Sequence, residues 1–328
     1  MRHAALALLL LAPCAAAFAE PAAPYTARPE VKAFVRDLVE RHGFAERELL
    51  RLLAHAKRQD AVLAAMQLRP SGVRSWTDYR AAFVNQERVQ AGLKFWARHR
   101  ATLARARVRF GVPEEVIVAI LGVETFYGRQ TGRRRVIDTL ATLAFDFPPR
   151  ARYFRAELED FLIFARDRRL DVLSVRGSYA GAIGIPQFMP GTYRRYAVDF
   201  DGDGACDLRQ AADAIGSVAN FLKEHGWRRG EAALLDVRVR GAGLSAYADG
   251  SLRPRYSLDE LETAGAHAYG VPPADGRAVL VELKTPGMPS EFRVGFHNFW
   301  VITRYNHSAF YASAVIDLAR TLRDEQPL

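Results

Sequence analysis

The sequence contains only two cysteines in 328 residues, Cys14 and Cys206. Cys14 lies within an N-terminal stretch that has the pattern of a removable leader, so after processing Cys206 has no partner within the chain. A disulfide framework is therefore excluded as the source of stability. The fold must be held by a hydrophobic core, to which a bound metal ion can add.

Motifs of several large enzyme classes are missing as well. The sequence has no Ser-His-Asp arrangement, no phosphate-binding loop and no dinucleotide fingerprint, and its eight histidines show no metal-ligand spacing. It has no internal repeat and no apolar run long enough to span a bilayer. Any catalytic or binding site is therefore expected to use carboxylate, amide, hydroxyl and aromatic side chains.

The first residues, MRHAALALLLLAPCAAAFAEP, have the pattern of a secretory signal peptide. A basic residue precedes a short apolar stretch, and Ala17-Phe18-Ala19 stands before Glu20. We expect residues 1–19 to be removed, leaving a soluble periplasmic protein. Cys14 offers the alternative of a lipid anchor, but Pro13 stands where a lipobox usually has a small residue.

Apolar residues are plentiful, at 49% of the chain, and two or three domains are expected from the length. The formal net charge is +9. Such a charge suits an exported protein that binds an anionic polymer, such as cell wall, lipopolysaccharide or nucleic acid. An arginine-rich proteome explains the charge equally well.

Helical patterns dominate residues 20–110, which we expect to form a helical N-terminal domain. VKAFVRDLVERHGF and ERELLRLLAHAKRQDAVLAAM repeat apolar residues every three or four positions, and Gly43 is expected to end the first helix. Residues 87–110 continue the pattern, which predicts one long amphipathic helix.

Residues 111–230 are expected to form a core. Pro113 and the two glutamates after it favour the start of a helix. Residues 116–123 carry no charge, so this helix should be buried on all sides. Further helical patterns occupy residues 152–167 and 211–226.

The pattern changes at residues 231–295, where LLDVRVR, AVLVELKT and EFRVGF alternate with a period near two. We expect a small antiparallel β domain here. Helical character returns in residues 296–328. The fold class is therefore α+β, mainly α, with a β insertion between helical segments.

Glu124 closes the uncharged run VAILGV at the expected C-terminal end of the buried helix. Desolvation and the negative end of the helix dipole both raise the pKa of a carboxyl in this position. A carboxyl that stays protonated near neutral pH can act as a general acid in glycosidic cleavage. The alternative is a solvated residue after a core helix, paired with Arg129.

A second group of candidates lies in RGSYAGAIGIPQFMPGTYRRY, residues 176–196. Its glycines let the backbone approach a ligand closely, and its hydroxyl, amide and aromatic groups are those that bind sugars. An ordinary glycine-rich turn between helices is the alternative. The nearby arginine runs 133–135 and 194–195 are better explained as solvated charged faces than as glycan contacts.

The segment Asp199-Phe200-Asp201-Gly202-Asp203-Gly204 opens like an EF-hand loop, with carboxylates at alternate positions and glycine at the turn. It predicts a structural calcium (Ca2+) site, with a metal-free aspartate turn as the alternative. The usual closing glutamate is replaced by Gln210. The carbonyl of Ala205 is a further expected ligand, and Asp207 can contribute through water.

The order and spacing of six motifs resemble the lytic murein transglycosylase B family. They cover nearly all of the chain after the leader: GVETFYG at 122–128, ATLAFDFPPRARYF at 141–154, GSYAGAIGIPQFMPGTY at 177–193, YAVDFDGDG at 196–204, AIGSVANFLKEHGW at 214–227 and ITRYNHSAFY at 302–311. The resemblance implies a lysozyme-like core flanked by a helical domain and a small β domain, with the C-terminal segment completing a cleft.

The resemblance also implies roles for individual residues. Glu124 becomes the single catalytic acid and base, and Asp213 becomes the calcium ligand that closes a longer loop. The implied sugar-contacting residues are Ser178, Gln187, Tyr305, Asn306 and Tyr311, together with Tyr79 and Arg150 in looser motifs. For the tyrosines, packing in an aromatic core is the alternative.

Two departures from the family pattern bear on substrate binding. Phe221 occupies a position where the family can carry tyrosine, so ring stacking remains but a hydroxyl contact is lost. Pro149 replaces one of two adjacent basic residues, which leaves Arg150 to meet an anionic group.

The resemblance implies non-hydrolytic cleavage of the β-1,4 bond between N-acetylmuramic acid and N-acetylglucosamine, giving 1,6-anhydromuramoyl products. The implied partner is the glycan strand of peptidoglycan and not nucleic acid. Two alternatives remain open. A hydrolytic muramidase needs a second carboxylate beside Glu124, and Asp138, Asp146 and Glu157 are near in sequence. A calcium-stabilised glycan-binding protein needs no functional acid.

Overall fold

The computed structural model describes residues 23–67, 75–240 and 243–326. The expected signal peptide and Cys14 lie outside them. The chain divides into two compact units at Ala54 and His55. In the first unit a short 3-10 helix, Tyr25–Ala27, precedes α1 (Pro29–His42) and α2 (Glu46–Ala54). Gly43 ends α1 at φ 66°, as the sequence predicted, in a conformation that glycine adopts without strain.

The second unit begins with five helices: α3 (Asp60–Gln67), α4 (Trp76–Phe83), α5 (Gln86–Arg98), α6 (Arg100–Phe110) and α7 (Glu114–Thr125). Five more helices follow before and after the sheet: α8 (Val136–Phe145), α9 (Ala151–Asp167), α10 (Pro190–Tyr196), α11 (Ala211–Glu224) and α13 (His297–Thr303). The last element is α14 (Ala309–Glu325). No helix of the described residues is long and apolar enough to cross a bilayer.

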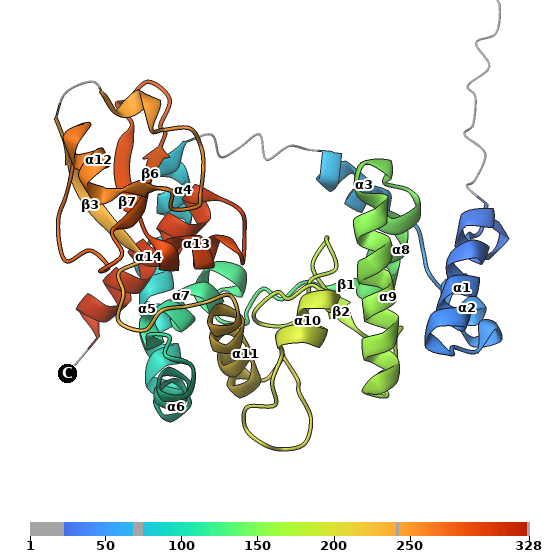
Figure 1. Ribbon diagram of the computed structural model, residues 1–328. Helices are drawn as coiled ribbons and strands as arrows, with labels where there is room; N and C mark the ends of the chain where they lie inside the picture. The colour runs from blue at the N-terminus through green and yellow to red at the C-terminus, as the bar shows by residue number, and fades with distance from the viewer. Residues whose placement is uncertain (1–22, 68–74, 241–242, 327–328) are drawn as a thin grey trace, which may run out of the picture. The chain divides into compact units, whose positions relative to one another are not determined.

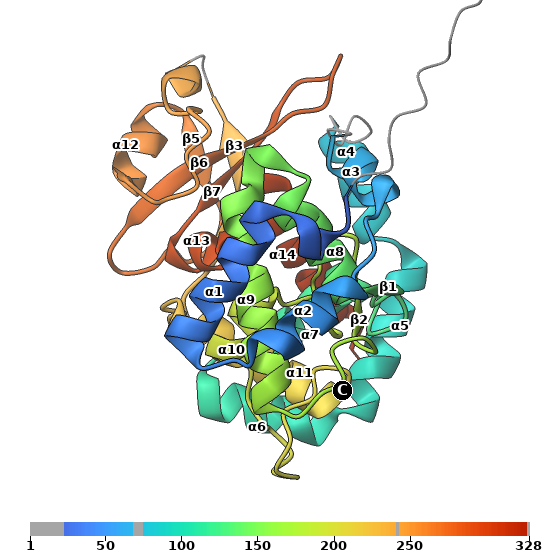
Figure 2. The ribbon, with the colours of Figure 1, turned by 90° about the vertical axis from the view of Figure 1, so that its right-hand side faces the viewer.

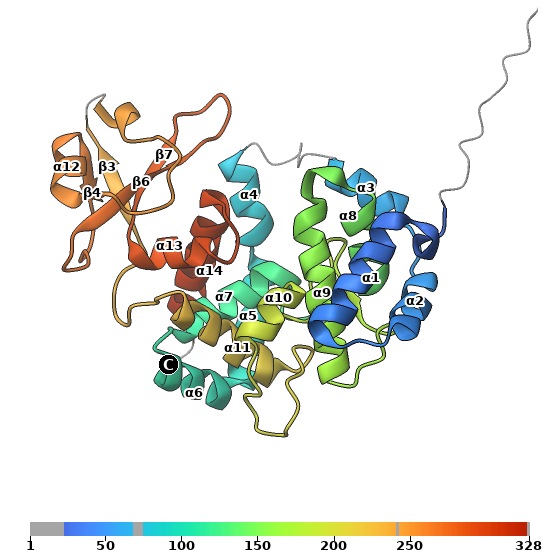
Figure 3. The same cartoon turned by 45° about the vertical axis from the view of Figure 1, so that its right-hand side comes forward.

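Helix α7 is the centre of the second unit. Its residues from Val116 to Val123 are all buried, which confirms the prediction from its uncharged sequence. Helices α5, α6, α11 and α14 all pack against it, and Figures 1 and 3 show α7 among them, with α8 and α9 side by side. A helix surrounded by others must be apolar around its whole circumference.

The β region is one antiparallel sheet of five strands in the order β4-β6-β7-β3-β5. The strands are β3 (Leu234–Val239), β4 (Tyr256–Ser257), β5 (Ala266–Ala268), β6 (Arg277–Leu283) and β7 (Glu291–Gly295). A 3-10 helix, Gly243–Ala246, and α12 (Leu258–Thr263) join the strands. Figure 2 shows four of these strands, β3, β5, β6 and β7, with α12 beside them. Buried apolar residues on these elements form a separate core, including Leu261, Leu280 and Phe296.

Two of the predicted helices are divided in the structure. Residues 87–110 form α5 and α6, because His99 leaves the helical conformation with φ −111° and ψ 21°. Residues 46–66 form α2 and α3, separated by a segment whose backbone bonds to α8. The N–H of Lys57 donates to Asp138, and the N–H of Gln59 donates to Thr142. Because these two N–H groups bond to α8, they do not form the backbone hydrogen bonds of one continuous helix.

Candidate active site

Glu124 lies in the last turn of α7, where the chain leaves the helix in an unusual way. Phe126 and Tyr127 both have positive φ, at 52° and 60°, and their N–H groups return to the carbonyls of Gly122 and Leu121. The Tyr127 ring then folds back against Gly122, where a Cβ atom would lie 2.7 Å from the ring carbon Cζ. The glycine therefore makes room for the turn that follows Glu124.

The carboxyl of Glu124 is desolvated, and Tyr311 of α14 donates a hydrogen bond of 2.6 Å to its Oε1. Burial raises the pKa of Glu124 to about 7, although the hydrogen bond from Tyr311 works in the opposite direction. The alternative partner, Arg129, instead stacks over the ring of Phe126. Glu124 can therefore carry a proton at neutral pH and release it readily.

One aromatic side chain stacks on Tyr311, and a second packs against the first. The Tyr305 ring stacks on Tyr311 at 6.3 Å with an interplanar angle of 16°, and its hydroxyl donates to the carbonyl of Pro186. Phe221 of α11 meets Tyr305 edge-on at 4.9 Å and is itself buried. Phe221 is thus a packing partner of Tyr305, so this structure assigns its ring to the core that supports the site.

Tyr79 of α4 is also close to Glu124, although 45 residues separate them in the sequence. Burial raises the pKa of Tyr79 to about 12, and the negative charge of Glu124 adds to the shift. Its ring packs on Phe83 and on Phe310 of α14. Phe310 immediately precedes Tyr311, so one turn of α14 holds both Tyr79 and Glu124.

The glycine-rich loop places Ser178 and Gln187 by backbone contacts. Ser178 Oγ accepts hydrogen bonds from the N–H groups of Ala180 and Ala182, which leaves its own hydroxyl proton free to donate. Gln187 has φ 53°, and its amide donates to the carbonyls of Thr131 and Gly184 at 3.2 and 2.9 Å. The Gln187 side-chain oxygen remains as an acceptor.

Asn306 and Arg150 are not joined to Glu124 by any interaction of the described residues, and the same holds for Ser178 and Gln187. Asn306 is exposed in the turn before α14. Arg150 is exposed before α9, and its guanidinium lies over the rings of Tyr153 and Phe154 at 4.6 and 5.3 Å. Both side chains are accessible to a ligand, and their roles stay predictions.

Arg88 is a contributor that the sequence alone did not reveal. It is buried in α5, its Nε donates to the carbonyl of Gly122 at the end of α7, and its guanidinium lies over the Phe126 ring at 4.8 Å. A cation at this end of a helix is favourable because of the helix dipole. An arginine among many in the sequence offers no signal of such a contact.

The three acidic residues considered as a second carboxylate are engaged elsewhere. Asp138 binds Arg135, Asp146 binds Arg58, and Glu157 accepts the N–H of Gly191. Tyr311 is the polar partner of Glu124, and among the described residues no other carboxylate shifts its pKa. The arrangement offers one proton-transferring carboxyl rather than a pair.

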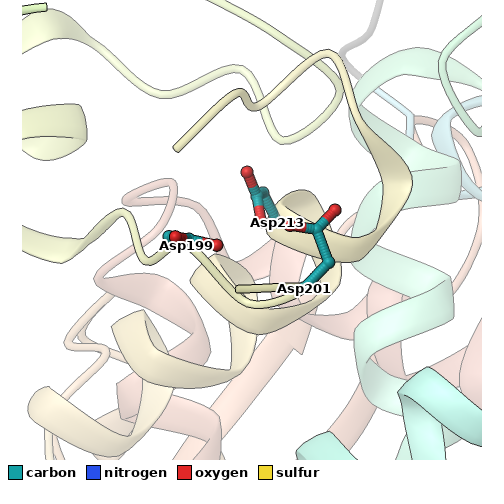
Figure 4. Close-up of side chains that lie close together, drawn as sticks. All are labelled: Asp199, Asp201 and Asp213. Carbon is teal, nitrogen blue, oxygen red and sulfur yellow. The ribbon is translucent and has the colours of Figure 1, made fainter. Parts of the chain in front are cut away.

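The aspartate loop brings three carboxylates together next to α11 (Figure 4). Oxygen atoms of Asp199, Asp201 and Asp213 lie within 4.8 Å of one another. Asp213 is buried, and its two oxygens accept the N–H groups of Phe200 and Asp207. Converging carboxylates repel one another, so this donor set fits a hard cation that prefers oxygen ligands, such as calcium.

The remaining expected ligands lie outside this group of three. Asp203 Oδ1 accepts the N–H of Ala205 at 2.8 Å, so this carboxylate is turned toward its own loop. Asp207 pairs with Arg209. The Gln210 position, which replaces a closing glutamate, is the N-cap of α11, and Asp213 in the first turn of that helix supplies the carboxylate.

Comparisons with known proteins agree with this geometry. A family model for the transglycosylase SLT domain matches residues 26–320. The chain is 42% identical over 303 residues to the membrane-bound lytic murein transglycosylase B of Escherichia coli K12, covering 90% of this chain and 82% of that protein.

Solved structures are similar over the same extent. Catenated lytic transglycosylase SltB1 from Pseudomonas aeruginosa matches with a TM-score of 0.87 and 42% identity, covering 92% of this chain and all of that chain. The Escherichia coli lytic transglycosylase Slt35 in complex with calcium matches with a TM-score of 0.82 and 41% identity, covering 91% and 94%. The fold is therefore the lysozyme-like fold of these enzymes. The chain belongs to the family of transglycosylase SLT domain proteins.

Proposed function

We propose that this protein is a peptidoglycan lytic transglycosylase in which Glu124 is both the acid and the base. Protonated Glu124 donates its proton to the oxygen between N-acetylmuramic acid and N-acetylglucosamine, and the C1–O bond breaks as positive charge develops at the muramoyl C1. The N-acetyl group of the substrate supports C1. The observation that carries this proposal is the place of the Glu124 carboxyl, in the last turn of a buried helix and 2.6 Å from the hydroxyl of Tyr311, where burial raises its pKa to about 7.

The second half-reaction returns the proton. Ionised Glu124 accepts the proton of the muramoyl C6 hydroxyl while that oxygen bonds to C1, which closes the 1,6-anhydro ring and restores the acid. No water is consumed. Tyr311 can donate to the Glu124 carboxylate while it is ionised, so this hydrogen bond stabilises the intermediate stage.

We assign substrate positioning to Ser178, Gln187, Tyr305, Asn306, Tyr311, Tyr79 and Arg150, with Phe221 as support for the Tyr305 ring. In this assignment residues 111–230 are the catalytic core, and residues 20–110, 231–295 and 296–328 flank it. A two-carboxylate hydrolase is less well supported, because Asp138, Asp146 and Glu157 have other partners.

Calcium is proposed as a structural ion held by Asp199, Asp201 and Asp213, with Asp203 and the Ala205 carbonyl as further ligands once the ion is present. The converging carboxylates support this proposal, as does the relative solved with calcium. The ion would neutralise the loop and fix it to α11. It takes no part in bond cleavage.

Glu124→Gln tests the function. Glutamine keeps the size and the hydrogen bond but has no transferable proton, so cleavage of purified peptidoglycan should fall by at least about 10²- to 10⁴-fold, while the melting temperature and glycan binding are retained. Mass spectrometry of wild-type products should show muropeptides one water lighter than those made by lysozyme. Products with a reducing muramic acid would make the protein a hydrolase, and no cleavage at all would leave a glycan-binding protein.

A further inference from the structure

A cavity of about 560 Å³ lies on the second unit, and nothing in the proposed reaction uses it. It is formed by the end of α9, the segment before β2 (Arg176–Gly177), part of the glycine-rich loop and the end of the aspartate loop. Its buried floor consists of Phe164, Ile183 and Tyr193. The volume is in the range of small-molecule sites, and an apolar floor is typical of them.

Three arginines line this cavity without an acidic partner among the described residues: Arg168, Arg169 and Arg176. The two acidic residues of the wall are already paired, because Asp207 binds Arg209 and Asp167 binds Arg166. Arginines therefore outnumber acidic residues in the lining of the cavity. Guanidinium groups are suited to binding carboxylate or phosphate through paired hydrogen bonds.

Arg168 lies near enough to Cys206 and Tyr193, two buried residues of the cavity, for its charge to act on both. Burial and the negative charge of Asp213 raise the pKa of the Cys206 thiol, and the charge of Arg168 opposes this shift. The same charge acts on Tyr193, whose hydroxyl is fixed between the carbonyl of Cys206 and the N–H of Leu208.

Arg169 has an unfavourable backbone conformation at the rim. Its φ is 52°, in the left-handed region that usually holds glycine after a helix. The N–H of Leu170 closes the turn by donating to Ala165. An arginine in place of the favoured glycine retains a cation beside the cavity at a cost in conformational energy.

We infer that this cavity is an accessory site that binds the carboxylate end of a small peptide, separate from the residues around Glu124. The inference rests on the proposed function, because peptidoglycan strands and their fragments carry stem peptides with free carboxylates. The apolar floor favours a carboxylate that bears small alkyl groups over free phosphate, which would leave Phe164 and Ile183 without a partner.

The cavity shares backbone with the proposed active site. Thr131 and Gly184 both line it, and the carbonyls of both accept the side-chain amide of Gln187. A ligand in the cavity would therefore contact the segments that hold Gln187. Binding there is expected to change how well the enzyme binds glycan, seen as a change in KM rather than in the chemistry of the product.

The test uses the full chain with calcium present and N-acetyl-D-alanyl-D-alanine as the probe, since this dipeptide carries one carboxylate and two methyl groups. Calorimetric titration should show binding that weakens at least about tenfold when the probe is amidated at its C-terminus. An Arg168→Ala, Arg176→Ala double variant should lose affinity to the same extent. Arg98→Ala, Arg100→Ala removes two exposed arginines outside the cavity and should bind like the wild type.

Equal binding of the amidated probe, or equal affinity of the cavity variant and the wild type, would overturn the inference. Inorganic phosphate that binds as tightly as the dipeptide would assign the site to a free anion and would also overturn it. If the double variant melts early, Arg168→Gln alone provides the comparison. Loss of dipeptide binding with unchanged anhydro products would support both proposals, whereas reducing-end products would refute only the proposed function.

Discussion

Tyr311 and burial act in opposite directions on the proton of Glu124. Burial favours the neutral acid, whereas the hydroxyl of Tyr311, at 2.6 Å, favours the carboxylate. The balance leaves a pKa of about 7, near the pH at which the group must both give and take a proton. A group poised in this way serves both half-reactions better than a strong acid or a strong base.

Tyr311→Phe should therefore raise the pKa of Glu124. The free enzyme needs the protonated acid, so kcat/KM of the wild type should fall as the pH rises through about 7. In the variant this fall should move to higher pH, with a lower maximum because the intermediate carboxylate loses its donor. Tyr305→Phe is the matched control, since that hydroxyl donates to Pro186; its pH profile should keep the wild-type midpoint. An unmoved midpoint in Tyr311→Phe would contradict the assignment.

At the residue scale, the sequence predicted that Glu124 lies at the end of a buried helix, but it did not predict all of the residues around Glu124. An uncharged run before Glu124 indicates burial because a buried helix cannot carry solvated groups, and α7 bears this out. Arg88 could not be predicted in the same way. Its contact with Gly122 depends on how α5 packs against α7, and packing between helices is not encoded in any local spacing.

A buried ion pair joins the sheet to two helices. Arg293 of β7 binds both oxygens of Asp317 on α14, at 2.6 and 3.0 Å, and Arg80 of α4 binds the same carboxylate at 2.7 Å. Arg293 also binds Glu291, which accepts the indole N–H of Trp76. Because Tyr79 lies on α4, this network ties the position of Tyr79 to the β domain.

Asp317→Ala should lower the free energy of unfolding by about 3–5 kcal/mol, because it removes the buried partner of the Arg293 guanidinium and leaves it only partners that are largely exposed. Arg80→Ala should cost no more than about 1 kcal/mol, since that side chain is 46% exposed. Urea denaturation of the two variants measures the difference. Similar values for both would mean that the pair stabilises the fold no more than a surface contact does.

The aspartate loop gives a prediction for metal removal. Calcium at about 100 times its dissociation constant adds about 2.7 kcal/mol to the free energy of unfolding by mass action, so the melting temperature should rise with calcium and fall with a chelator. Asp199→Asn, Asp201→Asn keeps the loop hydrogen bonds but removes two charges, and it should melt alike in both conditions. A wild type that is indifferent to calcium would remove the ion from the proposal.

Elements were predictable where a single pattern extends over a whole helix or strand. Alternating residues located β3, β6 and β7, although only Leu234 of β3 is buried and β6 is buried along most of its length. The two-residue β4 and three-residue β5 are too short for a period to show, and each exists through its pairing with a neighbour. The break between α5 and α6 was missed because apolar residues continue across His99 while the backbone does not.

For the whole molecule, the leader predicts where the protein acts. We propose that export and cleavage after Ala19 release a soluble periplasmic enzyme, whereas the similar Escherichia coli protein is named as membrane-bound. N-terminal sequencing of the protein from its native host should begin at Glu20, and the protein should fractionate with the soluble periplasm. A diacylated protein that begins at Cys14 would show instead that the lipid anchor is used.

The aspartate loop carries the proposed calcium ligands and also borders the arginine-lined cavity. This shared position has a thermodynamic consequence. Gly204, Ala205 and Asp207 lie between Asp201 and Asp213, two of the proposed calcium ligands, and also form a wall of the arginine-lined cavity. If calcium fixes this side of the cavity, calcium makes peptide binding more favourable by a certain free energy. The peptide must then make calcium binding more favourable by the same free energy. The apparent calcium affinity would then depend on the concentration of free peptide. Turnover of the cell wall would in this way regulate the stability of the enzyme that carries it out.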